Sequence, residues 1–194
     1  MQVEPIGVPN GLEAAPQPGP LGPEQVPIPL AKVLAPTGSP GLGQSVDGIK
    51  CQRNEQVIFH IHAHLTIFVD GKARSVPYGI GIGPPLSGQN TPAGAFVTSG
   101  KCFSWLHTHA ADGIIHIESP VQRTYTLGDF FDVWGQPLSS SQAGTAHGKL
   151  TAFVDGFLFK GDPRRIQLLA HSQIQLDIGT PLIAPERISF PDGL

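Results

Sequence analysis

The sequence is poor in charge, in cysteine and in long apolar runs, and each shortage excludes a class of protein. Only 14% of the 194 residues are charged, and the net charge is −3. A chain of this kind has no basic stripe for binding nucleic acid. The longest apolar runs are also far shorter than the ~20 residues that a membrane-spanning helix needs. We therefore expect no nucleic-acid partner and no transmembrane segment.

Glycine and proline are abundant, with 24 and 20 residues, about twice their average usage. Both residues disfavour helices, which excludes a helical bundle or a coiled coil. Short segments rich in β-branched and aromatic residues alternate with turn sequences such as Asp70-Gly71 and Asp155-Gly156. The sequence predicts an all-β domain over residues 51–194, either a β-sandwich or a small β-barrel, with one short helix opened by a capping box at residues 126–129.

The expected strands follow the β-rich segments at residues 57–69, 102–109, 114–118, 150–154, 157–159, 166–170 and 173–178, and residues 77–100 are expected to form a long loop. A short sequence similarity also links residues 65–71 with residues 150–156. This similarity allows an internal duplication of residues 51–120 and 140–185. A hairpin preference that the two segments share by chance explains it equally well.

The first 50 residues have a different composition from the rest. They contain ten of the 20 prolines and no aromatic residue, histidine or cysteine, which predicts an extended arm, partly in the polyproline II conformation. A disordered linker is the simplest interpretation, but residues 26–35 are largely apolar, unlike a solvated linker. We predict that the arm docks on a neighbouring copy of the chain through Val26, Ile28, Leu30, Val33 and Leu34.

The chain has two cysteines, Cys51 and Cys102. They either remain free thiols or form one disulfide, and we predict the disulfide because the two cysteines flank two histidine-rich segments that are adjacent strands if they share a metal. A disulfide, little lysine and abundant small polar residues indicate an extracellular or cell-surface protein. No signal peptide is visible after Met1, which leaves the export route open.

Six of the eight histidines lie in these two segments. In the first segment His60, His62 and His64 alternate with Ile61 and Ala63. Successive side chains of a strand point to opposite faces of the sheet. The three imidazoles are therefore expected to share one face, and the apolar residues between them the other.

The second segment carries His107 and His109, then the turn sequence Asp112-Gly113, then His116 and Glu118. If the turn has two residues, His109 pairs with His116, and His107 pairs with Glu118. A four-residue loop shifts this register but keeps the same face. Either hairpin places three imidazoles and a carboxylate in one cross-strand patch, where opposed Cβ atoms are about 5 Å apart.

Imidazole nitrogens and carboxylate oxygens are typical ligands of divalent transition metals. The alternative is a hydrogen-bonded belt of histidines on a solvated face. We predict one divalent transition metal, Cu or Zn, with ligands drawn from His60, His62, His64, His107, His109, His116 and Glu118.

The His107-x-His109 sequence with the downstream Glu118 resembles the first metal-binding motif of the cupins. The resemblance covers about a dozen residues, and the glutamate follows more closely in cupins than it does here. A cupin-like β-domain implies a bound transition metal and a dioxygenase or isomerase activity.

Two functions from different classes follow from these patterns. In the first, an exported structural protein assembles head-to-tail through its arm into an extracellular filament or array, and the metal is a structural clip. In the second, the domain is a cupin-like mononuclear metalloenzyme and the arm is a tether. An enzyme needs an open coordination position and a substrate cleft. Because five or six ligands are sufficient to fill the coordination sphere, the sequence favours the structural protein over the enzyme.

Overall fold

The computed structural model describes residues 11–38 and 40–194. The first ten residues of the predicted arm and Ser39 lie outside this description. The described chain confirms the predicted all-β fold, because strands dominate it and its single α-helix is short, α1 (Leu127–Trp134), with one 3₁₀ turn, η1 (Pro163–Arg165). No helix in these described ranges is both long and apolar enough to pass through a membrane.

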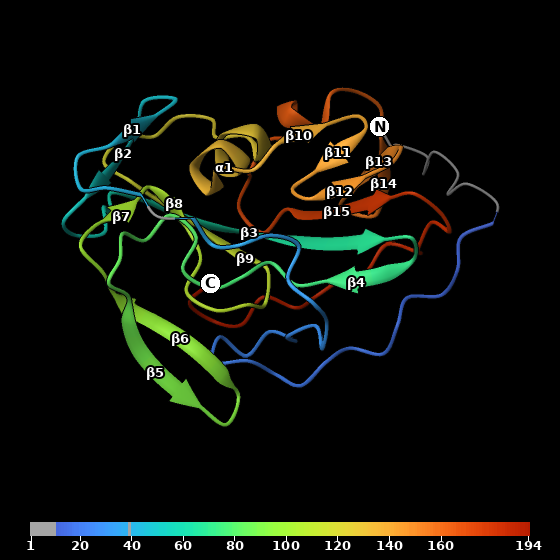
Figure 1. The fold of residues 1–194 in the computed structure, drawn as a ribbon, viewed down its shortest axis with the longest axis horizontal. Helices are drawn as coiled ribbons and strands as arrows, with labels where there is room; N and C mark the ends of the chain where they lie inside the picture. The colour runs from blue at the N-terminus through green and yellow to red at the C-terminus, as the bar shows by residue number, and fades with distance from the viewer. Residues whose placement is uncertain (1–10, 39) are drawn as a thin grey trace.

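Fifteen strands in the described part of the chain form four sheets, the largest with seven strands (Figure 1). Their bounds are β1 (Ser45–Val46), β2 (Ile49–Gln52), β3 (Phe59–Val69), β4 (Lys72–Arg74), β5 (Ser87–Thr91), β6 (Gly94–Ser99), β7 (Phe103–Ser104), β8 (Leu106–His107), β9 (Ile114–Ser119), β10 (Leu138–Ser139), β11 (Gln142–Ala143), β12 (Ala146–His147), β13 (Leu150–Val154), β14 (Phe157–Phe159) and β15 (Gln173–Ile178).

The seven-stranded sheet is built around β3, the longest strand. Its order is β14-β13-β15-β3-β9-β8, and β4 also pairs with β3. The β15–β3 pair is parallel, whereas the other pairs are antiparallel. The N-terminal half of β3 pairs with β9 and its C-terminal half with β15 and β4. Strand β3 therefore joins the early and late segments of the chain.

One face of β3 belongs to the hydrophobic core. Ala63, Leu65 and Ile67 are buried there in the same hydrophobic cluster as the aromatic side chains of α1. The helix begins at the predicted capping box of Thr126 and Asp129 and ends at a glycine in the left-handed region. In Figure 1, α1 lies on one side of β3 and β9, and the first, dark-blue part of the arm lies on the other. The arm then returns to α1, where Trp134 Nε1 donates to Pro36 O at 2.7 Å. The opposite face of β3, which carries the histidines, therefore turns toward the first part of the arm.

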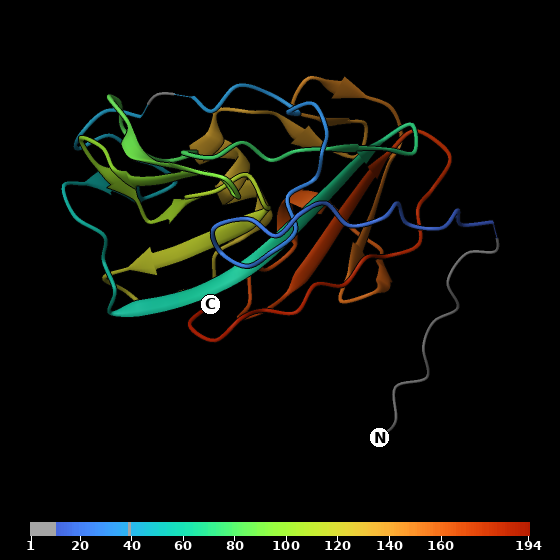
Figure 2. The same cartoon turned by 90° about the horizontal axis from the view of Figure 1, so that it is seen from below.

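The described part of the arm packs on the β-domain of its own chain. Its backbone bonds to the domain at both ends, where Glu13 N donates to Leu182 O at 2.9 Å and Leu34 N donates to Ser75 O at 3.0 Å. Between these points the arm crosses the sheet in front of β3 (Figure 2). Proline-rich backbone forms few hydrogen bonds of its own. The β-domain therefore supplies hydrogen-bond partners for the backbone of the arm.

The five arm residues predicted to mediate self-association differ in their surroundings. Val26 and Leu34 are buried in the chain's own structure, and Ile28 is half-buried. Leu30 and Val33 are 85% and 54% exposed. The contact between copies stays a prediction. Of the five predicted residues, Leu30 and Val33 are the two whose side chains are exposed enough to meet another copy.

Three local predictions were wrong. Residues 77–100 contain the β5–β6 hairpin instead of only a loop. Strand β5 is poor in β-formers, but Thr91 Oγ1 closes the turn by accepting from Ala93 N at 3.1 Å and donating to Gly94 O at 2.9 Å. Residues 166–170 form no strand, only a single bridge at Gln167. Strand 102–109 is shorter and broken, as β7 and β8.

The disulfide between Cys51 and Cys102 is present. It closes a loop with a sequence separation of 51 residues and links β2 to the segment before β7. Strands β2 and β7 also pair directly. The bridge therefore reinforces an existing strand contact, and both sulfur atoms are buried.

We expect the double variant Cys51→Ala/Cys102→Ala to unfold at a lower urea concentration than the wild type. Opening a loop of this length costs about 4 kcal/mol in the chain-entropy account of disulfides. The measurement is equilibrium urea unfolding, with the reduced wild-type protein as the matched sample. Equal unfolding midpoints for oxidised wild type and double variant would contradict the prediction.

Candidate metal centre

Three adjacent strands align the histidines in one row. His62 on β3 lies opposite His116 on β9, and His116 lies opposite His107 on β8. His60 lies opposite Glu118 in the next row of the β3–β9 pair. The two histidine-rich segments are therefore adjacent strands, as predicted.

Of the two registers that the sequence allows, the hairpin has that of the four-residue loop and not that of the two-residue turn. His107, and not His109, pairs with His116, so the loop between β8 and β9 is longer than Asp112-Gly113. The shift of two residues keeps the side chains on the same face, because side-chain direction repeats every two residues. Gly113 fits this loop because its φ is +87°, and a Cβ there would lie 2.4 Å from Leu65 O.

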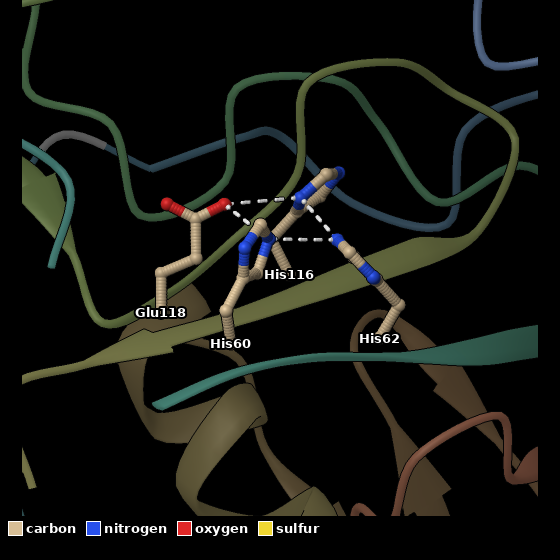
Figure 3. Close-up of side chains that lie close together, drawn as sticks. All are labelled: His60, His62, His116 and Glu118. Atoms are coloured by element: carbon tan, nitrogen blue, oxygen red, sulfur yellow. Dashed lines mark hydrogen bonds and ion pairs between the residues drawn. The ribbon is translucent and has the colours of Figure 1, made fainter. Parts of the chain in front are cut away.

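The first group of ligand atoms comes from β3 and β9 (Figure 3). His62 Nε2 lies 3.2 Å from His60 Nε2 and 3.1 Å from His116 Nδ1. Glu118 Oε1 lies 3.3 Å from His60 Nε2 and 3.3 Å from His116 Nδ1. The four side chains point to one another, and each offers one ligand atom within 4.8 Å of all the others.

The second group consists of His107, His109, His116 and Glu118, again with ligand atoms within 4.8 Å of one another. His107 Nδ1 lies 2.9 Å from Ser104 O, and His109 Nδ1 lies 2.5 Å from Val97 O. A carbonyl oxygen only accepts hydrogen bonds, so each Nδ1 carries the ring proton. In a neutral imidazole the Nε2 atom is then a bare acceptor.

These two bare acceptors face each other, because His107 Nε2 and His109 Nε2 are only 3.1 Å apart. No hydrogen bond joins two lone pairs, so the contact requires a cation or an added proton. Burial and the nearby charge of His109 lower the pKa of His107 well below its usual value. Burial and the charge of His116 likewise lower the pKa of His109. A metal ion bound by both nitrogens would satisfy them without protonating either ring.

The other buried rings also favour the neutral form that binds metals. Burial, with the charges of His116 and His60, lowers the pKa of His62 to about 3. His116 is the exception in the metal-free protein. Burial alone would lower its pKa, but hydrogen bonds to Glu118 and Glu24 raise it to about 9. His116 therefore carries a positive charge, and its Nδ1 atom would have to lose its proton before it could bind a metal ion.

The spacing of the ligand atoms fits a transition metal. Ligands about 2.0–2.1 Å from a tetrahedral zinc ion are about 3.3 Å apart. His62 Nε2 lies at the similar distances of 3.2 Å from His60 Nε2 and 3.1 Å from His116 Nδ1. Glu118 adds an oxygen, and its Oε2 atom is buried with no hydrogen-bond partner among the described residues. Each group supplies four ligands, the number in a closed structural zinc site.

His64 is the predicted ligand that lies apart from both groups. Its Nε2 atom lies 2.8 Å from Asp112 O, across the β3–β9 end of the sheet. Burial lowers the pKa of His64 to about 4. A neutral His64 that donates to this carbonyl fastens the loop between β8 and β9 to β3.

Two glutamates near the centre were missed in the sequence analysis. Glu24 Oε1 lies 2.8 Å from His116 Nε2, and Glu55 Oε1 lies 3.5 Å from His109 Nε2. Burial and repulsion from Glu118 raise the pKa of Glu55. Neither glutamate belongs to a histidine motif. Only the packing of the arm and of the β2–β3 connection brings them to the site.

Comparison of the chain with protein-family models, with curated proteins and with solved structures finds no match. The chemistry of the site therefore rests on the side chains described above.

We expect His116→Ala, which removes a ligand that both groups share, to lower the metal content and to abolish the gain in Tm that Zn²⁺ gives the wild type. Binding to the native state alone adds about 2.7 kcal/mol to the free energy of unfolding when free metal is 100 times the Kd. The measurements are elemental analysis and thermal unfolding with Zn²⁺ or with EDTA. The matched control is His147→Ala, an exposed histidine on β12. Equal metal content in the two variants would refute the site.

We expect His64→Ala to keep the metal content of the wild type while lowering stability. The variant loses a buried hydrogen bond and leaves the carbonyl of Asp112 unpaired, a loss of about 1–3 kcal/mol. Elemental analysis measures the metal content, and urea unfolding measures the stability. Loss of metal in this variant would place His64 among the ligands after all.

Proposed function

We propose that this protein binds a divalent transition metal in the His/Glu centre of its β-domain. The observation that carries the proposal is the 3.1 Å contact between His107 Nε2 and His109 Nε2, whose protons both lie on Nδ1. Copper and zinc are the expected ions, since imidazole-rich sites suit both. The buried and unpartnered Oε2 atom of Glu118 supports the same conclusion.

The proposed role of the metal is structural. Its ligands come from β3, β8, β9 and the loop after β8, so a bound ion cross-links segments that are far apart in the sequence. All ligands except His60 are buried. A closed site with four protein ligands stabilises a fold, whereas a catalytic site keeps one position open.

The proposed location is extracellular or at the cell surface. The buried disulfide supports this location, because disulfides form and persist in oxidising compartments.

Self-assembly through the arm is the second part of the proposed function. Leu30 and Val33 are exposed apolar side chains on the arm, and Leu30 borders a cavity of about 790 Å³ between the arm and the sheet. If these two exposed side chains dock on the next copy while the rest of the arm stays on its own domain, every chain makes the same contact with its neighbour. Such a head-to-tail contact propagates without closing, and a filament is its product.

A mononuclear metalloenzyme is the alternative. It is favoured by a second cavity, of about 230 Å³, which is lined by His60, His62 and His171 and gives access to the edge of the centre. The side chain of His60 is 39% exposed there. Exchange of His60 for a water or a substrate would open one coordination position.

Elemental analysis of the natively purified protein, followed by titration of the metal-free protein with Zn²⁺ and Cu²⁺, tests the metal function. We expect saturable binding with a defined number of ions per chain. A content near zero together with no saturable binding would overturn the proposal. A coordinated water, seen by spectroscopy of the loaded protein, would favour the enzyme.

We expect deletion of residues 1–46 to abolish assembly, measured by light scattering and electron microscopy. Because the deletion also removes buried residues of the arm, a double variant, Leu30→Ser/Val33→Ser, is the sharper test. Both side chains are exposed, so the variant keeps its fold and loses only the contact with other copies. Leu169→Ser, an exposed leucine away from the arm, is the control. If the wild type stays monomeric at high concentration, the arm does not mediate self-assembly and acts only as a tether.

A further inference from the structure

We propose that the arm is a latch on the metal centre, in which Glu24 positions His116 as a ligand, so that metal binding and docking of the arm strengthen each other. The inference rests on the proposed metal function and adds a role for a residue outside both ligand groups. In this proposal the arm raises the metal affinity of the centre in its own chain.

A compact turn carries Glu24 into the site. Ile28 N donates to Pro20 O at 2.9 Å, and Gly22 N donates to Val26 O at 2.8 Å, so the chain folds back on itself on either side of Glu24. Val26 is fully buried. The turn is also close to the β5–β6 hairpin, since a Cβ on Gly94 would lie 2.9 Å from Ile28 Cδ1. The position of Glu24 is therefore fixed by contacts on both sides.

The hydrogen bond of Glu24 determines which nitrogen of His116 faces the ligand group. Glu24 Oε1 accepts from His116 Nε2 at 2.8 Å. The other nitrogen, Nδ1, points toward His62 Nε2 and Glu118 Oε1, at 3.1 and 3.3 Å. A carboxylate that accepts from the outer nitrogen of a ligand histidine fixes the tautomer and the ring orientation, and increases the basicity of the inner nitrogen.

Burial makes this contact costly without a cation. The side chain of Glu24 is 6% exposed, and its Oε2 atom is buried with no hydrogen-bond partner in residues 11–38 and 40–194. Glu118 is similarly buried, and Glu55 and Asp112 are the other acidic groups that lie around the cluster. Buried carboxylates need a nearby positive charge. A divalent ion beside His116 supplies more positive charge than the imidazolium alone, which favours the docked arm.

By thermodynamic linkage, the effect of the docked arm on metal affinity equals the effect of the metal on docking of the arm. If the docked arm raises the affinity of the centre for a metal by some factor, the metal raises the stability of the docked arm by that factor. Loss of an outer carboxylate from a ligand histidine typically lowers metal affinity about 10–100-fold. Local opening of the arm at Ile28 is then expected to become about 10–100-fold rarer when the metal is bound.

The experiment compares wild type, Glu24→Gln and Glu13→Gln. Glu13→Gln is the matched control. It makes the same chemical change on the same arm, but at an exposed side chain. Zn²⁺ affinity is measured by competition with a chelator, and amide exchange of Ile28 is measured by NMR with and without Zn²⁺. The absorption spectrum of the Co²⁺-loaded protein reports whether the ligand geometry changes.

We expect Glu24→Gln to bind Zn²⁺ about 10–100-fold more weakly than Glu13→Gln and to shift the Co²⁺ spectrum. In the wild type, Zn²⁺ should slow the exchange of Ile28 by the same factor, and in Glu24→Gln it should not. A wild type that binds Zn²⁺ but shows equal affinities in the two variants, or an Ile28 exchange rate indifferent to Zn²⁺, overturns the latch and leaves the metal function standing. A wild type that binds no metal removes both.

Discussion

The contact between the bare nitrogens of His107 and His109 is the constraint on which the rest of the site depends. Ser104 and Val97 hold the ring protons on the outer nitrogens, so the inner nitrogens repel each other unless a cation lies between them. Strand pairing keeps the rings together whether or not that cation is present. The β-sheet thus pre-organises side chains that could hold a metal ion, and the entropy of gathering them is already lost when the domain folds.

The same strand satisfies two opposite demands. The apolar residues of β3 complete the hydrophobic core against α1, and the residues between them form the polar centre. A slip of one residue in the β3–β9 register would exchange the two faces. The large loss of core burial in the slipped register fixes the positions of His62 and His116 within the site. Hydrophobic packing on one face therefore provides the precision of coordination on the other.

The sequence predicts the parts of this structure that depend on local patterns. Alternation places the histidines of β3 on one face, the Thr126 box opens α1, and the Asp-Gly pairs at residues 70–71 and 155–156 form hairpin turns. It does not predict the length of the loop before β9, because both registers keep the same faces. It also misses Glu24, which reaches His116 across 92 positions of the chain. Only the folded path of a proline-rich arm makes that contact.

The parallel pairing of β3 with β15 has a consequence for biogenesis. His64 lies beside Gln173, so the central strand lacks its neighbour on one edge until β15 has been synthesised. Contacts between such distant segments form slowly, since a long loop must close before they contribute. Strand β15 therefore closes the free edge of β3 late, after the histidine-bearing strands β3, β8 and β9 have already been made.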